Sequence, residues 1–170
     1  MVFPLVVTAV DPSRPVTLNL KLDYAVCEKL CIPAQGAARL DVTESQTRFT
    51  AHIASAEAQV PLRAGFGPDP GRPALLKAAT GMASGKPVLS FTLKAPMAIQ
   101  IADVLVEGPD MWVFGASRLS QQPGGPWHAA IPLEDRPKAE GGLTPLLVTI
   151  IGNGQSFEIP LDLDIPVATP

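Results

Sequence analysis

Cys27 and Cys31 are the two cysteines of this 170-residue chain, and three residues separate them in the stretch "LDYAVCEKLCIPAQG". Two thiols this close can bind a metal ion, form a stable local disulfide, or alternate between dithiol and disulfide. A bridge between them would close a short loop, for which chain entropy predicts only about 2 kcal/mol of stabilisation. The spacing therefore favours redox exchange, while a local structural disulfide and two reduced, inert thiols stay open as alternatives.

Metal binding finds less support in the sequence. A structural zinc site normally needs four ligands with paired spacing, and His52 and His128 lie far from each other and from the cysteines. We expect His52 on the polar side of a helix and His128 at the start of a strand, both without a chemical role. Copper(I) accepts low-coordinate thiolates, so a copper-binding domain is a third alternative, although no Met or His cluster supports it. The sequence thus predicts no cofactor and no metal ligand.

Other chemistries lack their usual patterns. The acidic residues show no pair at the spacing typical of glycosidases, and "GFGPDPG" lacks the Lys-Ser/Thr of a phosphate-binding loop. A net charge of −3 without a basic cluster argues against nucleic acid as a partner. The longest apolar runs are too short to cross a bilayer. Trp112 and Trp127 are expected to be core or sheet-face aromatics rather than a ligand platform.

The segment that holds the cysteines has the period of a β-strand. Residues 16–24 alternate between apolar and polar side chains, which predicts a half-buried strand. Residues 3–10 and 37–42 are two further strand candidates. The first segment is therefore predicted to be a small β unit of about three strands, with the cysteines at the connection between two of them.

The middle of the chain changes period. Residues 43–60 are predicted to form an amphipathic helix, with Thr43 and Gln46 as a capping box and Pro61 at the end. Its apolar positions recur at helical spacing: Phe49, Ile53, Ala56 and Val60. Residues 62–87 are rich in Gly and Pro, so we interpret them as a linker with one helical turn around "ALLKAA".

The strand pattern returns at Val88. Four segments follow at regular spacing, namely "VLSFTLKA", "IADVLVE", "MWVFGAS" and "WHAAIPLE". A hairpin with Asn153-Gly154 as its turn closes the chain. Pro132 and Pro160 cannot donate to a ladder, so we expect edges or bulges there.

The predicted fold class is mainly all-β, with immunoglobulin-like β-sandwich units and one connecting α-helix. The predicted domains are a partial β unit with the cysteine pair over 1–45, the helix and linker over 46–87, and a second immunoglobulin-like domain over 88–170. We expect this second domain to fold independently of the cysteines.

The stretch "VTLNLKLDYAVCEKLCIPAQGAARLDV" resembles the end of the periplasmic domain of the thiol:disulfide interchange protein DsbD family. It is most similar to the ScsB-like branch, the suppressors of copper sensitivity. The shared pattern is an alternating strand ending in an aromatic residue, then Val-Cys, three residues, Cys-Ile-Pro and a short strand. This resemblance covers about residues 3–43.

The resemblance implies a function. Members of the family are inner-membrane enzymes that pass electrons from the cytosol to the periplasm. Their β domain receives reducing equivalents from a thioredoxin-like domain of the same protein and delivers them to periplasmic disulfide isomerase-type partners. It implies that Cys27 and Cys31 are the redox pair of a protein-disulfide reductase module. It also implies that Cys31 bonds to the partner and that Cys27 resolves the mixed disulfide; the sequence adds that Cys27 should sit against the sheet and Cys31 in the turn.

The chain also departs from the family. A β-rich first half precedes this motif in relatives, often with a loop that caps the cysteines, and we expect position 1 to fall inside that domain. Strands that lack their neighbours present unpaired edges, so self-association or pairing with the second domain is expected. The rival interpretation is a partner-binding β-sandwich scaffold in which the cysteines form a structural disulfide.

Overall fold

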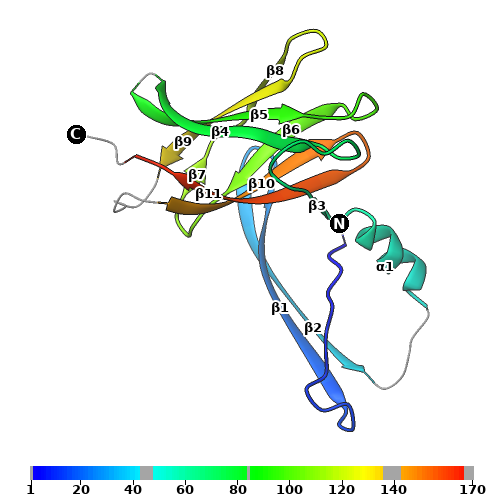
Figure 1. Ribbon diagram of the computed structural model, residues 1–170. Coiled ribbons are helices and arrows are strands. Elements are labelled where there is room, and N and C mark those ends of the chain that lie inside the picture. Colours follow the sequence, from blue (N-terminus) through cyan, green and yellow to red (C-terminus); the bar gives the residue numbers. More distant parts are fainter. Residues whose placement is uncertain (1, 43–47, 84, 136–142, 167–170) are drawn as a thin grey trace. The chain divides into compact units, whose positions relative to one another are not determined.

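The computed structural model describes residues 2–42, 48–83, 85–135 and 143–166. The chain divides into two compact units, Met1–Ala58 and Gln59–Pro170, and each is described by itself. Strands dominate both, together with one described helix (Figure 1). This confirms the mainly all-β class with a sandwich and a helix, whereas the immunoglobulin-like topology stays a prediction.

The first unit contains one long antiparallel hairpin. Strand β1 (Val16–Cys27) pairs with β2 (Cys31–Val42) along their whole length. The predictions for residues 16–24 and 37–42 are confirmed, and the cysteines lie at the connection between the two strands. The expected half-burial of residues 16–24 is wrong for most of its length, because the outer part of β1 is exposed on both faces.

The strand predicted over residues 3–10 is wrong, because these residues form no ladder in the structure. Pro4 has no amide to donate, and the segment ends in a turn in which the Arg14 amide donates to the Asp11 carbonyl at 3.2 Å. The Ser13 amide and hydroxyl also donate to the Asp11 carboxylate, and these bonds lower the pKa of Asp11. The described residues of this unit therefore form two strands, where about three were predicted.

Helix α1 (Thr50–Glu57) is shorter than predicted. Phe49 is its N-cap and makes no side-chain capping bond; Thr43 and Gln46 lie outside the described residues. The helix ends at Glu57 with Ala58 as its C-cap, so it stops before Pro61 and the proline is not what ends it. Of the apolar positions predicted to form one face, only Ala56 is buried.

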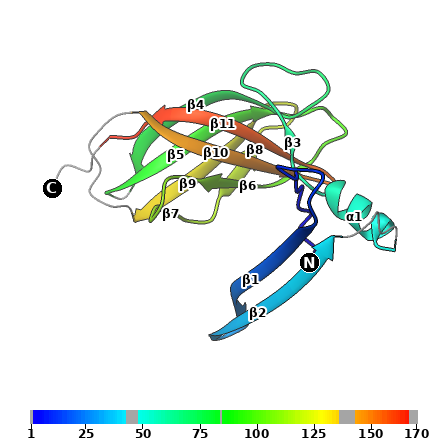
Figure 2. The ribbon, with the colours of Figure 1, turned by 90° about the horizontal axis from the view of Figure 1, so that it is seen from below.

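The second unit is a sandwich of two sheets (Figures 1 and 2). One sheet has the order β3 (Leu62–Arg63), β11 (Ser156–Asp164), β10 (Leu143–Gly152) and β6 (Ile101–Glu107). The other has the order β4 (Ala74–Ala83), β5 (Lys86–Lys94), β9 (Trp127–Asp135) and β7 (Val113–Phe114), with β8 (Arg118–Gln121) also paired to β9. The strands place alternate side chains between the sheets.

A single apolar core fills the space between the sheets. Its fully buried members come from both layers, and they include Leu75, Leu89, Phe91, Leu93, Val104, Ile131, Val148, Ile150 and Ile159. Trp112 and Trp127 are partly buried and pack against this core, which confirms their predicted structural role. Hydrogen bonds among the described residues also join segments of the two layers, for example from the Thr80 hydroxyl to the Asp164 carbonyl at 3.1 Å and from the Ser117 hydroxyl to the Asp103 carboxylate.

The prediction that residues 62–87 form a linker with a helical turn is wrong. Leu62–Arg63 pair with β11, and Ala74–Ala83 form β4, which pairs with β5. Leu75 is fully buried and lies opposite Leu93. Burial of this side chain against the sheet outweighs the local helical tendency of "ALLKAA", because propensity is a weak prior against tertiary packing.

The later strands follow the sequence pattern more closely. Strands β5, β6, β9, β10 and β11 lie where alternation predicted them, while "MWVFGAS" contributes only Val113–Phe114. The β10–β11 hairpin turns at Asn153-Gly154, as predicted, and Gly154 has a φ of 94°.

The two strand prolines behave differently. Pro160 pairs with Leu147 on one side, and on the other side β3 reaches only Glu158, which confirms the edge prediction. Pro132 lies in β9, an inner strand between β5 and the β7/β8 edge, so the edge alternative is wrong there; a register shift lies close by, however, between the β7–β9 pairs Val113/Asp135 and Phe114/Leu133, as the bulge alternative expected. It is tolerated because it falls between the two neighbours on this side, β8, whose first residue Arg118 pairs with Ala130, and β7, whose Phe114 pairs with Leu133.

Candidate functional site

Cys27 and Cys31 form the last pair of the β1–β2 ladder. Cys27 ends β1, Cys31 begins β2, and the register places them directly opposite each other. Their Cα atoms are 4.0 Å apart and their sulfurs are joined in a disulfide of 2.05 Å. The tight connection of Glu28, Lys29 and Leu30 is closed by a long 3.4 Å contact from the Glu28 amide to the Leu30 carbonyl.

Both cysteines are exposed. The expectation that Cys27 packs against the sheet and that Cys31 lies in the turn is wrong, because both occupy ladder positions at the end of a two-stranded ribbon. Among the described residues of its own unit, the exposed ribbon has no second layer that would bury one sulfur more than the other. The assignment of Cys31 as the attacking residue therefore stays a prediction that rests on the family resemblance.

The register gives the ribbon two chemically different faces. Side chains of directly opposite residues lie on the same face, so every second pair shares a face. The cysteine face also carries the pairs Thr17/Asp41, Asn19/Arg39, Lys21/Ala37, Asp23/Gln35 and Ala25/Pro33. The opposite face carries only apolar residues and Gly36: Val16/Val42, Leu18/Leu40, Leu20/Ala38, Leu22/Gly36, Tyr24/Ala34 and Val26/Ile32.

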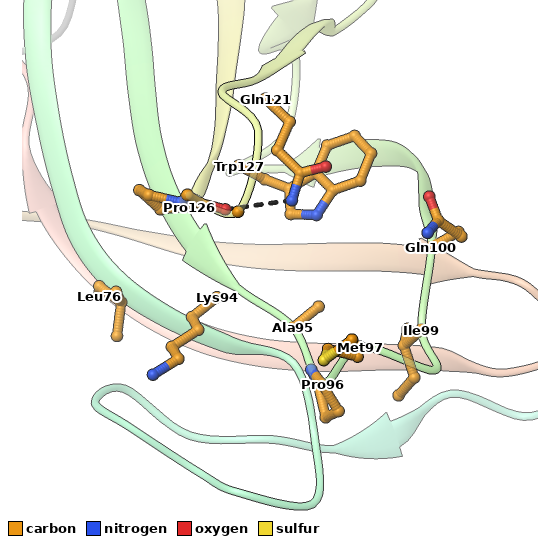
Figure 3. Close-up of a pocket in the computed structure, with 12 residues that line it drawn as sticks. Leu76, Lys94, Ala95, Pro96, Met97, Ile99, Gln100, Gln121, Pro126 and Trp127 are labelled. Carbon is orange, nitrogen blue, oxygen red and sulfur yellow. Dashed lines mark hydrogen bonds between the residues drawn. The ribbon is translucent and has the colours of Figure 1, made fainter.

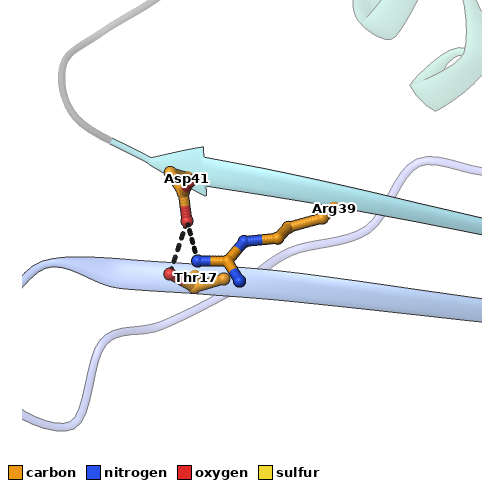
Figure 4. Close-up of polar contacts among 3 residues, drawn as sticks. All are labelled: Thr17, Arg39 and Asp41. Atoms are coloured by element: carbon orange, nitrogen blue, oxygen red, sulfur yellow. Dashed lines mark hydrogen bonds and ion pairs between the residues drawn. The ribbon is translucent and has the colours of Figure 1, made fainter.

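A small polar network lies on the cysteine face at the other end of the ribbon (Figure 4). The Asp41 carboxylate accepts the Thr17 hydroxyl at 2.6 Å and the Arg39 guanidinium at 3.2 Å. All three side chains are exposed, so these bonds contribute little stability. Because strands rise about 3.3 Å per residue, the network is too far from the sulfurs to affect their reactivity by direct contact.

The other side chains that could do chemistry stay apart from the cysteines. His52 is exposed on α1 and lies beside the Phe49 ring, with 6.5 Å between the ring centroids. His128 is exposed on β9, 3.5 Å from the Thr92 hydroxyl. Within the described residues, no three His, Cys, Asp or Glu side chains gather in a way that could hold a metal ion.

Sequence reasoning missed an open groove in the second unit (Figure 3). It has a volume of about 540 Å³ and lies between the β5–β6 connection and the β8–β9 turn. Lys94, Met97 and Trp127 are among its lining residues, and the Gln121 side chain donates to the Gly125 carbonyl at its rim. The lining comes from separate strands and turns, so no local sequence signal could have revealed it.

No helix of the described residues has the length and apolar character needed to span a bilayer. No family model matches the sequence, and no curated protein matches it.

One solved structure matches the fold. It is the crystal structure of the N-terminal periplasmic domain of ScsB from Proteus mirabilis, with a TM-score of 0.58 and 17% sequence identity. The match covers 86% of this chain and 57% of that chain, so this chain spans little more than half of the ScsB domain. At this identity the match shows the fold, and the chain is thus similar to a ScsB-type, DsbD-like periplasmic domain at the level of fold.

Proposed function

We propose that this chain is a periplasmic thiol–disulfide exchange module in which Cys27 and Cys31 carry reducing equivalents to partner oxidoreductases. The observation that carries the proposal is the disulfide across the final, exposed pair of the hairpin. A sulfur in this position is open to a thiolate of another protein, and exchange requires such access. The fold match to a periplasmic ScsB domain supports the location and the reaction class.

The proposed reaction begins with the reduced pair. The Cys31 thiolate attacks an oxidised partner's disulfide, forms a mixed disulfide, and releases the partner's other sulfur as a thiolate, which takes a proton. Cys27 then attacks the Cys31 sulfur, which restores the Cys27–Cys31 bond and releases the second partner thiol. Two electrons and two protons pass to the partner in each cycle.

The hairpin suits the resolving step. The ladder holds Cys27 directly opposite Cys31, so the second attack needs no new strand pairing. A thioredoxin-like domain of a parent membrane protein would then reduce the pair again by the same two-step exchange. The partners proposed are that domain and periplasmic proteins of the disulfide isomerase type.

Equilibrium titration against glutathione tests the function. An exchange module should show a reduction potential in the range of periplasmic and related oxidoreductases, roughly −120 to −230 mV, whereas a structural staple should lie below about −300 mV. The fraction of reduced pair is read by thiol alkylation and mass spectrometry. A potential in the lower range would favour the scaffold interpretation and contradict the proposal.

A trapping experiment tests the roles of the two cysteines. The partner is a disulfide isomerase that lacks its resolving cysteine and carries a thionitrobenzoate group on the remaining one. Cys27→Ser should release the coloured group and accumulate a stable mixed disulfide. Cys31→Ser should react at least about tenfold more slowly, a difference of about 1.4 kcal/mol in barrier. Equal rates, or the reverse order, would show that the assignment of attack to Cys31 is wrong.

A further inference from the structure

The apolar face of the β1–β2 hairpin is large, and no described residue of its own unit covers it. Seven of its bulky side chains expose between 44% and 62% of their surface: Leu20, Leu22, Tyr24, Val26, Ile32, Leu40 and Val42. A two-stranded hairpin is at best marginally stable in water without a layer packed on it. Exposed apolar patches of this size also mark interaction sites. Both arguments indicate that another surface covers this face.

The relief of the face indicates what that surface is. Toward the middle of the hairpin, β1 presents a ridge of large side chains, Leu20, Leu22 and Tyr24. Their partners on β2 are the small residues Ala38, Gly36 and Ala34. The three large residues therefore form a ridge along β1. The three small residues form a lower strip of equal length along β2, which we call the hairpin groove.

Gly36, at the centre of the groove, has no local reason to be glycine. A Cβ atom built there would meet no other atom within 4 Å, and its φ lies outside the left-handed region. Glycine inside a strand weakens it and often marks a place where another chain approaches closely. The missing side chain at this position thus leaves room for a group from outside the hairpin.

A second copy of the hairpin fits this relief. A two-fold axis parallel to the strands, midway between two facing ribbons, places β1 of each copy opposite β2 of the other at the same level. Leu22 of one copy then lies over Gly36 of the other, and each ridge enters the facing groove. An axis perpendicular to the strands would instead set ridge against ridge.

We propose that this apolar face is the interface of a symmetric dimer of the chain, packed as two facing sheet layers. At roughly 100 Å² for each of the seven exposed residues, each copy would bury about 700 Å², near the ~800 Å² per partner of a standard interface. No charged side chain lies on this face, so pairing desolvates no ion. The Cys27–Cys31 disulfide lies on the opposite face and stays accessible in the dimer.

Sedimentation equilibrium of the full chain tests the proposal. The protein should dimerise. Gly36→Leu, which fills the groove, should weaken dimerisation and raise the dissociation constant of the dimer at least about tenfold. Ala37→Leu is the matched control: it adds the same side chain one residue away on the polar face, and should change the constant less than about twofold. The double variant Leu22→Ala with Gly36→Leu exchanges ridge and groove, so it should recover most of the lost affinity.

Cross-linking provides a second measurement that does not depend on the stability of the Gly36 variant. Tyr24 is replaced by the photoreactive p-benzoylphenylalanine in an equal mixture of unlabelled and isotope-labelled chains. Mixed-isotope cross-links should map to β2 around Ala34. A protein that stays monomeric, a dimer that Gly36→Leu leaves unchanged, or cross-links confined to one chain would each overturn the proposal.

Discussion

Replacement of Leu75 by Ala tests whether residues 62–87 are part of the folded core. In the structure Leu75 is fully buried between the sheets and lies opposite Leu93. Removal of a side chain from such a site costs about 2 to 5 kcal/mol, from lost transfer free energy and from the cavity left behind. A linker residue would cost close to nothing, because surface substitutions stay within about 0.5 kcal/mol.

The neighbouring residue supplies the control. Leu76 is the same residue type in the same strand, but it is the extra residue at the register shift between Leu75 and Lys77, is only half-buried, and lines the open groove. Leu76→Ala should therefore cost clearly less than Leu75→Ala, about 1 kcal/mol or below. The pair of variants separates burial in the core from any general effect of shortening a side chain in β4.

Tryptophan fluorescence during urea unfolding measures the difference. The chain has two tryptophans, Trp112 and Trp127, and both pack against the core of the second unit, so the signal reports on that unit. With a typical slope of about 2 kcal/mol per molar urea, a loss of 3 kcal/mol lowers the midpoint by about 1.5 M. Equal midpoints for the Leu75 and Leu76 variants would refute the core position of β4.

Two further predictions concern the second unit. A fragment of residues 59–170 should unfold cooperatively, with the same midpoint as the full chain in the fluorescence assay. A fragment of residues 88–170 should show no cooperative transition, because it lacks β3 and β4. Cooperative unfolding of the shorter fragment would instead support a domain that begins at residue 88, as predicted from the sequence. Gly154→Ala should cost about 1 kcal/mol by thermal unfolding, because φ is 94° there and alanine is strained at positive φ; an unchanged or raised Tm would contradict this.

Local alternation of apolar and polar residues was enough to predict several strands, even where the burial itself does not alternate. Residues 16–24 and 156–164 both show the period of two, and both form strands. The turn at Asn153-Gly154 was equally visible, because this dipeptide accepts the positive φ that a tight hairpin needs. These features depend on neighbours in sequence, which is why a pattern can show them.

The wrong secondary-structure predictions concern segments whose structure depends on partners that are distant in sequence. "ALLKAA" has helical residues, and it becomes a strand because Leu75 is buried opposite Leu93. Residues 3–10 are as apolar as a strand, yet in the structure they find no partner with which to form a ladder. Without knowledge of the distant partner, residue type alone gave the wrong answer in both cases.

The sequence was enough to select the two cysteines of the candidate site. It was not enough to predict how exposed they are or which residues surround them. The spacing of Cys27 and Cys31 and the motif around them were sufficient to select the pair. The exposure of both sulfurs, and the row of small residues on β2, required the register of the hairpin. Ala34, Gly36 and Ala38 become a groove only because they lie opposite Tyr24, Leu22 and Leu20.

The same register controls both the disulfide and the apolar face. If the pairing of β1 with β2 slipped by one residue, every side chain of one strand would move to the other face of the ribbon. Cys27 and Cys31 would then lie on opposite faces. The slip would also set the large side chains of β1 beside the polar residues of β2. A disulfide between these residues is compatible only with the register that keeps the apolar face continuous. Oxidation of the pair therefore selects the arrangement in which one face can dock while the other presents the exchangeable sulfurs.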